Sequence, residues 1–161
     1  MRTPATTSVP RGEEPLDAVL RPIHNTWVEE TRRFLEPASE PGADFWTRWA
    51  AVRYLSDDFR DWYRRERALV DELHSFLRPD VAERLVREGD RLFRLRLELD
   101  RIGRRRGTAA EVAACTRDLL EQLGIWCAEI ELAAAGLTRD ALPAEATDLL
   151  AHLETAVSIQ R

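Results

Sequence analysis

The apolar residues of this chain recur every three or four positions over most of its length, and this periodicity constrains the fold more than any other feature. The first stripe begins at Leu16 and continues through Val19, Leu20, Ile23 and Trp27, which is the spacing of one face of an α-helix. No stretch of the sequence shows the sustained alternation of apolar and polar residues that a half-buried β-strand requires. The pattern therefore predicts an all-α fold.

Local signals at the helix ends divide the periodic pattern into five segments. Asp44 is predicted to cap the second helix, and Thr108 with Glu111 forms a capping box before the fourth. Asp80, with Glu83 three residues later, resembles a capping box before the third helix. Gly or Pro follows most of the predicted ends. The five predicted helices cover about residues 15–35, 44–77, 80–103, 108–136 and 143–157.

Four long amphipathic helices with short connections favour an antiparallel up-down-up-down four-helix bundle, with the short fifth C-terminal helix packed across one end. Residues 1–12, MRTPATTSVPRG, contain almost nothing that a core would bury. We therefore expect them to be a disordered leader. Residues 13–161 are then a single domain, and the 44% hydrophobic content of the chain is enough for one core.

The charge balance argues against two classes of partner. The chain carries 24 basic residues, all of them arginine, against 29 acidic residues, so its net charge is −5. Such a chain has no overall positive field for nucleic acid or for an anionic membrane. It also has no recognisable signal peptide and no apolar run of membrane length. We therefore expect a cytoplasmic protein that binds neither nucleic acid nor membranes.

Several motifs along the chain resemble those of one known family. The run RRERALVDEL, which starts at Arg64, is similar to the E-E-x-x-L-F-P-x-L run of hemerythrin-like domains of the HHE type. Counterparts of the later family motifs follow in the same order as LVREGDRL, GIWCAEIELAAAGL and LPAEATDLLAHLE. The likeness spans residues 15–157. It implies a four-helix bundle, and in the family histidines and carboxylates from the four helices bind a non-haem di-iron centre.

Most of the ligands that the resemblance implies are replaced in this chain. His24 stands where the family has its first histidine, but Asp61 falls at the next histidine position and Arg65 at a bridging glutamate position. A register shift of one residue would place Trp62 and Glu66 at the site instead, and would still supply no second histidine. Either register leaves the second helix without an imidazole ligand.

The later helices have lost their ligands as well. Gly89 and Gly124 occupy the two later histidine positions, and Ala128 replaces the second bridging carboxylate. A di-iron centre needs several neutral imidazoles together with bridging carboxylates. We therefore expect no metal cofactor. Weak binding of a single metal ion such as iron is the alternative, and its candidate ligands are His24, Asp61 and Glu66.

Two interpretations of the former metal site remain open. Arg65 would supply a permanent cation in place of the metal, paired with Asp61 one helical turn earlier. In the first interpretation, bulky side chains such as Trp62 or Trp126 fill the remaining space. In the second, a vacated pocket holds a small anionic or planar molecule. The residues that would line this pocket are His24, Asp61, Trp62, Arg65, Gly89, Gly124 and Ala128.

The second predicted helix carries more aromatic residues than one buried face can hold. Trp46, Trp49 and Trp62 differ in helical phase from Tyr54 and Tyr63. Part of the aromatic set must therefore be exposed, beside the arginines of the same helix. Phe45 and Trp49 also belong to the stripe that we predict to be buried. Exposed aromatic and arginine side chains are typical of protein interfaces, so we expect a protein partner or a homodimer here.

These observations favour a non-enzymatic function. The leading hypothesis is an interaction or regulatory module built on a hemerythrin-like bundle that lacks a functional di-iron centre. One alternative is a small-molecule-binding protein, or a cofactor-independent enzyme of specialised metabolism, that uses the vacated cavity. A second alternative is a weak mononuclear metal-binding or sensing protein.

Overall fold

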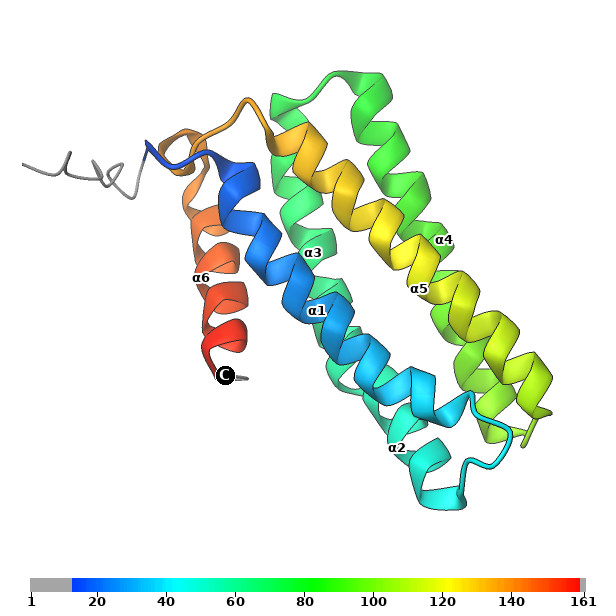
Figure 1. Cartoon of the computed structure of the whole chain (residues 1–161). Helices are drawn as coiled ribbons and strands as arrows, with labels where there is room; N and C mark the ends of the chain where they lie inside the picture. Colours follow the sequence, from blue (N-terminus) through cyan, green and yellow to red (C-terminus); the bar gives the residue numbers. More distant parts are fainter. Residues whose placement is uncertain (1–12, 160–161) are drawn as a thin grey trace, which may run out of the picture.

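A computed structural model describes residues 13–159, and within this range the chain is helical and contains no β-strand (Figure 1). The predicted all-α class is confirmed. The leader predicted at residues 1–12 lies outside the described residues. Two short 3₁₀ turns, His74–Phe76 and Arg139–Ala141, interrupt the connections. The α-helices are α1 (Leu16–Ala38), α2 (Phe45–Ser56), α3 (Asp58–Leu73), α4 (Pro79–Arg104), α5 (Ala109–Ala134) and α6 (Ala144–Ile159).

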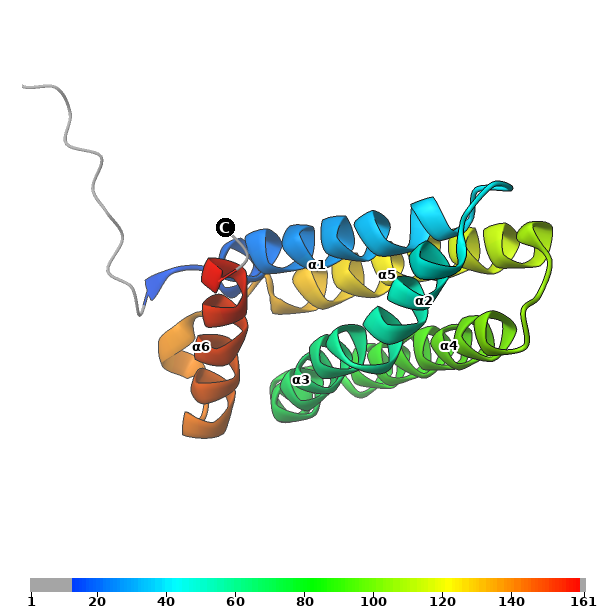
Figure 2. The same ribbon diagram turned by 90° about the horizontal axis from the view of Figure 1, so that it is seen from below.

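The segment predicted as one helix over residues 44–77 consists of two helices. α2 ends at Ser56 and α3 begins at Asp58, because the backbone of Asp57 has φ −107° and ψ −78°. Neither Pro nor Gly lies near this break, so the sequence carries no local signal for it. The two helices continue in different directions (Figure 2). Hydrogen bonds from the Asp57 N–H to the Arg53 carbonyl and from the Asp61 N–H to the Asp57 carbonyl still join the two helices across this kink.

The side-chain caps predicted for α2 and α5 are confirmed, whereas the one predicted for α4 is wrong. Asp44 accepts a hydrogen bond from a backbone N–H of the first turn of α2 at 2.7 Å. Thr108 and Glu111 form a reciprocal capping box at the start of α5. No such box forms at Asp80, because α4 already begins at Pro79, whose fixed φ suits the first helical position.

The turn between α4 and α5 also differs from its prediction. Gly103 was expected to end the helix, but α4 continues to Arg104, and Arg106 adopts a left-handed φ of 55°. The N–H of Gly107 donates to the carbonyl of Ile102 at 2.9 Å, and the N–H of Arg106 donates to the carbonyl of Gly103 at 3.3 Å. These two bonds form a Schellman motif with arginine at the position that usually holds glycine.

The helices pack around one core. α5 lies against both α1 and α4, α2 contacts α1 and α4, and α3 contacts α4 and α6. Figure 1 shows α1 and α5 side by side, with α6 on the outer side of the molecule. The start of α1 is tied to the connection before α6 by a hydrogen bond from the Leu16 N–H to the Leu137 carbonyl at 2.9 Å. α2 and the α4–α5 turn lie together at the opposite end (Figure 1).

Candidate functional site

A buried histidine joins three helices in the interior. His24, on α1, is only 1% exposed. Its Nε2 lies 2.9 Å from Oε1 of Glu66 on α3, and its Nδ1 lies 2.8 Å from Oε2 of Glu131 on α5. Arg21 also donates a hydrogen bond to Glu131, at 3.3 Å. Because both ring nitrogens face carboxylate oxygens, the geometry favours the doubly protonated imidazolium.

The surroundings of the cluster keep this charge in place. Burial disfavours the charged ring, but the charges and hydrogen bonds of Glu66 and Glu131 outweigh it and raise the pKa of His24 to about 9. Burial also opposes ionisation of Glu131, yet His24 and Arg21 hold its pKa below the usual value. Burial and the same carboxylates raise the pKa of the Cys127 thiol well above its usual value. At neutral pH the cluster therefore holds a charged ring beside a neutral thiol.

The structure brings together only some of the predicted residues of the second helix. Trp62 and Glu66 point into the interior, as the register shift of one residue requires. Asp61 lies at the surface and Arg65 is half-buried, and they form none of the ion pairs found among the described residues. The expected internal pair does not form. Trp62 and Glu66 face the interior, and Asp61 and Arg65, one position earlier, are turned about 100° away from it. His24, and not Arg65, supplies the internal cation.

The predicted small residues do not enclose a cavity. Gly89 is buried, whereas Gly124 and Ala128 are exposed on the outer face of α5. A Cβ atom at Gly89 would lie 2.9 Å from the indole of Trp126, whereas one at Gly124 would meet no atom within 4 Å. The indole N–H of Trp126 donates to the carbonyl of Leu85 at 2.9 Å and fixes the ring in this position. The glycine on α4 thus makes room for tryptophan, and the seven residues do not surround a common pocket.

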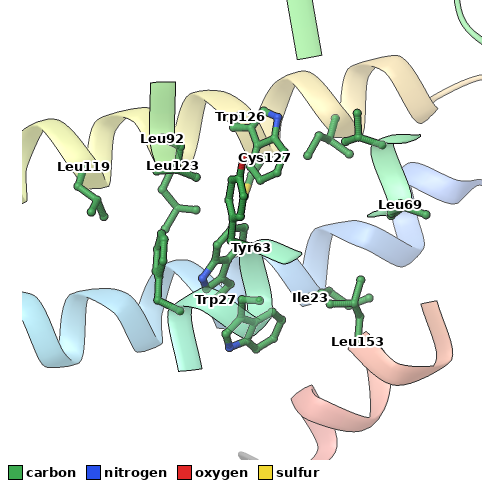
Figure 3. Close-up of a cluster of buried hydrophobic side chains, with 14 of the residues drawn as sticks. Ile23, Trp27, Tyr63, Leu69, Leu92, Leu119, Leu123, Trp126, Cys127 and Leu153 are labelled. Atoms are coloured by element: carbon green, nitrogen blue, oxygen red, sulfur yellow. The ribbon is translucent and has the colours of Figure 1, made fainter. Parts of the chain in front are cut away.

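Aromatic rings fill the space where the second interpretation placed a pocket. Trp27 stacks on Trp62, with ring centroids 6.0 Å apart, and meets the edge of Trp126 at 6.2 Å. Tyr63 lies 5.3 Å from Trp126 and donates a hydrogen bond to the carbonyl of Gly89 at 3.1 Å. Figure 3 shows the rings of Trp27, Tyr63 and Trp126 gathered in the middle of the core. The packing supports the filled-core interpretation.

These interior residues do not fit the di-iron centre that the resemblance implies. The cluster has a single imidazole, His24, and carboxylates occupy both of its nitrogens. Asp61, a candidate ligand for a single metal ion, is exposed at the surface. Within the described part of the chain, no group of three or more His, Cys, Asp and Glu residues is arranged to hold a metal ion. The cluster is built as an internal ion network.

The unusual feature of the surface is an aromatic patch on α2, which consists of Phe45, Trp46 and Trp49. Their side chains are 58%, 73% and 45% exposed. Phe45 packs edge-on against Trp46 at 5.1 Å and stacks on Trp49 at 6.4 Å. The expectation that part of the aromatic set is exposed is confirmed. The assignment of Phe45 and Trp49 to the buried stripe is wrong, because the opposite side of α2 packs against the core.

The other three members of the predicted aromatic set, Tyr54, Trp62 and Tyr63, are buried. Tyr54 donates to or accepts from the hydroxyl of Thr31 at 2.7 Å. Trp62 and Tyr63 both face the core, although they were assigned to opposing phases. Both residues belong to α3, after the break, and the buried face of that helix is wide enough for two adjacent positions. The break at Asp57 separates Trp62 from Trp46 and Trp49, with which it was grouped.

Beside the aromatic patch lies a groove of about 580 Å³, which we call the arginine groove. Its ionisable lining residues are Arg48, Arg104 and Arg106, with no carboxylate. Arg48 donates through Nη1 to the carbonyl of Gly107 at 3.3 Å, while its Nε is buried without a hydrogen-bond partner. Arg104 pairs with Asp100 at 3.1 Å. The complete lining is Ala43, Phe45, Arg48, Trp49, Val52, Gly103, Arg104 and Arg106.

Sequence reasoning missed Glu131 of the interior cluster and the position of Arg106 beside α2. Glu131 lies four positions after buried Cys127, on the edge of the apolar stripe of α5, and an acidic residue in that register is a signal for a buried partner. The run Arg104 to Arg106 is a basic turn that the sequence offers either as a local patch for an acidic partner or nucleic acid or as a solvated helix end. Nothing local indicates that this turn faces α2. Its place in the groove depends on the packing of α2 against α4.

Comparisons of the chain with protein-family models, curated proteins and solved structures gave no match. Within residues 13–159, no helix is long and apolar enough to cross a membrane. The function has to be argued from the interior cluster, the aromatic patch and the arginine groove.

Proposed function

We propose that this chain is a non-enzymatic interaction module that binds a partner protein through the aromatic patch of α2. One observation carries the proposal: α2 is apolar on both sides, although only one side has a partner in the fold. Ala51, Val52, Tyr54 and Leu55 face the core, while three aromatic rings face outward. Contiguous exposed apolar surface marks an interaction site.

The composition of the patch supports a protein partner. Tryptophan and arginine dominate the energetically important residues of protein interfaces, and both lie here within one helix and the adjacent turn. Trp46 is the most exposed of the three rings. Covering a large apolar side chain on binding contributes about 1.5–3 kcal/mol. Two tryptophans together are therefore sufficient to anchor a partner of moderate affinity.

The resemblance suggests how the scaffold is organised. We infer a hemerythrin-like bundle of antiparallel up-down-up-down type, in which α2 and α3 together form one arm and α6 is the additional short helix. The helix order and the contacts of α5 with α1 and α4 support this arrangement. A further support is that carboxylates from α3 and α5 meet His24 of α1. Glu66 lies one position after Arg65, and Glu131 lies three positions after Ala128, the two bridging positions that the family implies. An internal ion network then replaces the metal.

The proposal is tested by selecting peptides from a random displayed library on the purified chain. Binding of the selected peptides is then compared with the Trp46→Ala and Trp49→Ala variants. We expect losses of about tenfold or more, because central interface tryptophans contribute that much or more. The matched control is Leu132→Ala, on α5, whose side chain is 75% exposed outside the patch. Selected peptides that bind the two tryptophan variants as well as the unmodified chain would contradict the proposal.

A further inference from the structure

We propose that the partner presents an acidic segment with a large apolar side chain, and that this segment lies in the arginine groove. The inference rests on the proposed function, to which it adds the chemistry of the partner. It comes from the groove beside the patch and not from the patch itself. The three rings alone would accept any apolar segment, whereas the groove distinguishes between charges.

The charges around the groove are of one sign. Its three ionisable residues are all arginine, in a chain whose net charge is −5. This local excess of positive charge therefore runs against the charge of the whole molecule. A guanidinium is the side chain best suited to hold a carboxylate through paired hydrogen bonds. An acidic ligand is the complement of this lining.

Two of these arginines retain unused donors. Arg48 uses Nη1 to reach the Gly107 carbonyl, while its Nε is buried and has no hydrogen-bond partner. That Nε is not accessible from the groove, but Arg48 has no carboxylate partner among the described residues, so its charge is not neutralised within them. Arg106 is exposed and has no side-chain partner among the described residues. Asp100 already neutralises part of Arg104. Arg48 and Arg106 are therefore the principal contacts for carboxylates.

The apolar part of the lining accounts for the apolar side chain of the ligand. Phe45, Trp49 and Val52 contribute apolar side chains to the lining. The volume of the groove is about 580 Å³. Ligand-binding sites in proteins typically have volumes of about 300–1,000 Å³, so the groove is large enough for a few side chains. A segment with one large apolar residue between acidic residues matches both parts of the lining.

Two other occupants conflict with the charges. A second copy docked face to face would use the same patch on both molecules, and this would place the arginines of one groove opposite those of the other. Residues 1–12 of the chain contain Arg2 and Arg11 and no acidic residue, so they do not complement the groove either. These conflicts favour a separate protein over self-association.

The experiment compares three fluorescein-labelled peptides of the repeating composition Glu-Glu-Leu-Glu-Glu-Phe, with Gln or Lys replacing Glu in the second and third. Fluorescence anisotropy with the full chain at low salt measures their affinities. We expect the Glu peptide to bind most tightly and the Lys peptide most weakly. Arg106→Glu should weaken the Glu peptide about tenfold and reduce the preference for acidic over basic peptides. Arg48→Gln should weaken the same peptide while leaving the helical circular dichroism unchanged.

The controls separate the inference from the proposed function. Arg87→Glu, at an exposed position in the first half of α4, changes the net charge equally and should leave the preference intact. If the three peptides bind equally and Trp49→Ala abolishes their binding, the aromatic patch is still an interaction surface, but the preference for an acidic partner is refuted. Absence of any binding that depends on Trp49 would overturn both. Tighter binding of single-stranded oligothymidylate than of the Glu peptide would also overturn the inference, because bases stack on exposed aromatic rings in such sites.

Discussion

The stability of this protein should fall as the pH rises from weakly acidic to weakly alkaline values, because of His24. Its carboxylate neighbours raise the pKa of the folded-state imidazole from 6.5 to about 9. Between these two values the folded chain binds a proton that the unfolded chain has released. Folding stability therefore decreases with pH in this range. The contribution is fully present below about pH 6.5 and is lost as the pH passes through about 9.

The size of the effect follows from the same two values. At about 1.4 kcal/mol per pH unit, the elevated pKa of His24 corresponds to about 3 kcal/mol of stability. About 2 kcal/mol of this should be lost between about pH 6.5 and about pH 8.5. Within that window the cysteines contribute little, because unfolded thiols ionise near pH 9.0 and burial raises the pKa values of Cys115 and Cys127 in the folded chain. The lowered pKa of Glu131 also contributes to stability, and this contribution is lost only as the pH falls below 4.5. It therefore does not affect the slope between about pH 6.5 and about pH 8.5.

Urea unfolding at a series of pH values measures the slope, and NMR titration of the imidazole measures the pKa of His24 directly. Glu131→Gln should lower that pKa and reduce the slope, because it removes one charge and keeps a hydrogen-bonding side chain. His24→Gln should abolish the slope and cost about 3–5 kcal/mol, since it leaves the buried carboxylate of Glu66 without its cation. A free energy of unfolding that stays constant across this pH range in the unmodified chain would refute the assignment of an imidazolium.

Three further predictions concern local packing and exposure. Gly89→Ala should destabilise the chain by about 1–2 kcal/mol in urea unfolding, because its Cβ would lie 2.9 Å from the buried Trp126 indole. In the matched change Gly124→Ala, the new Cβ meets no atom within 4 Å. This variant should be more stable by about 0.5–1 kcal/mol, because alanine favours the helix over glycine. Arg106→Gly should stabilise the chain by about 1 kcal/mol, because it removes the cost of a left-handed residue with φ 55°, while weakening the acidic peptide; a lowered midpoint would contradict this. Acrylamide should quench part of the tryptophan fluorescence. This quenchable part should be smaller in Trp46→Ala, and bound peptide should shield it from acrylamide in the unmodified chain.

The helix content was predictable from the sequence because it depends on local information. The apolar spacing and the side-chain caps at Asp44 and Thr108 are encoded within a few residues, and the structure contains both. The break at Asp57 was not predictable, because its neighbours all favour or tolerate helix and only packing against α1 and α4 distinguishes one bent arm from one straight helix. The start of α4 at Pro79 shows that a fixed φ can outweigh a favourable capping pattern.

The candidate site was predictable only in part, because it depends on which helix faces meet. His24 stands out as a polar residue in an apolar stripe, and the spacing alone was sufficient to suggest that it is buried. Its partners depend on the rotation of α3 and α5, and a difference of one residue exchanges Asp61 for Trp62 and Arg65 for Glu66. The spacing of apolar residues within one helix does not determine how that helix is rotated about its axis relative to its neighbours.

The position of the charges argues that binding takes place at the surface of this protein and not at its centre. In the interior, His24 contacts both carboxylates and Arg21 supports Glu131, so the charges are paired, although Oε2 of Glu66 is buried without a hydrogen-bond partner. A ligand there would have to displace both these ion pairs and the stacked rings of Trp27 and Trp62. The arginine groove has the opposite character, with positive side chains that retain free donors beside uncovered rings. A ligand gains most where such groups are uncompensated, so the groove is where substitutions should change binding without changing the fold.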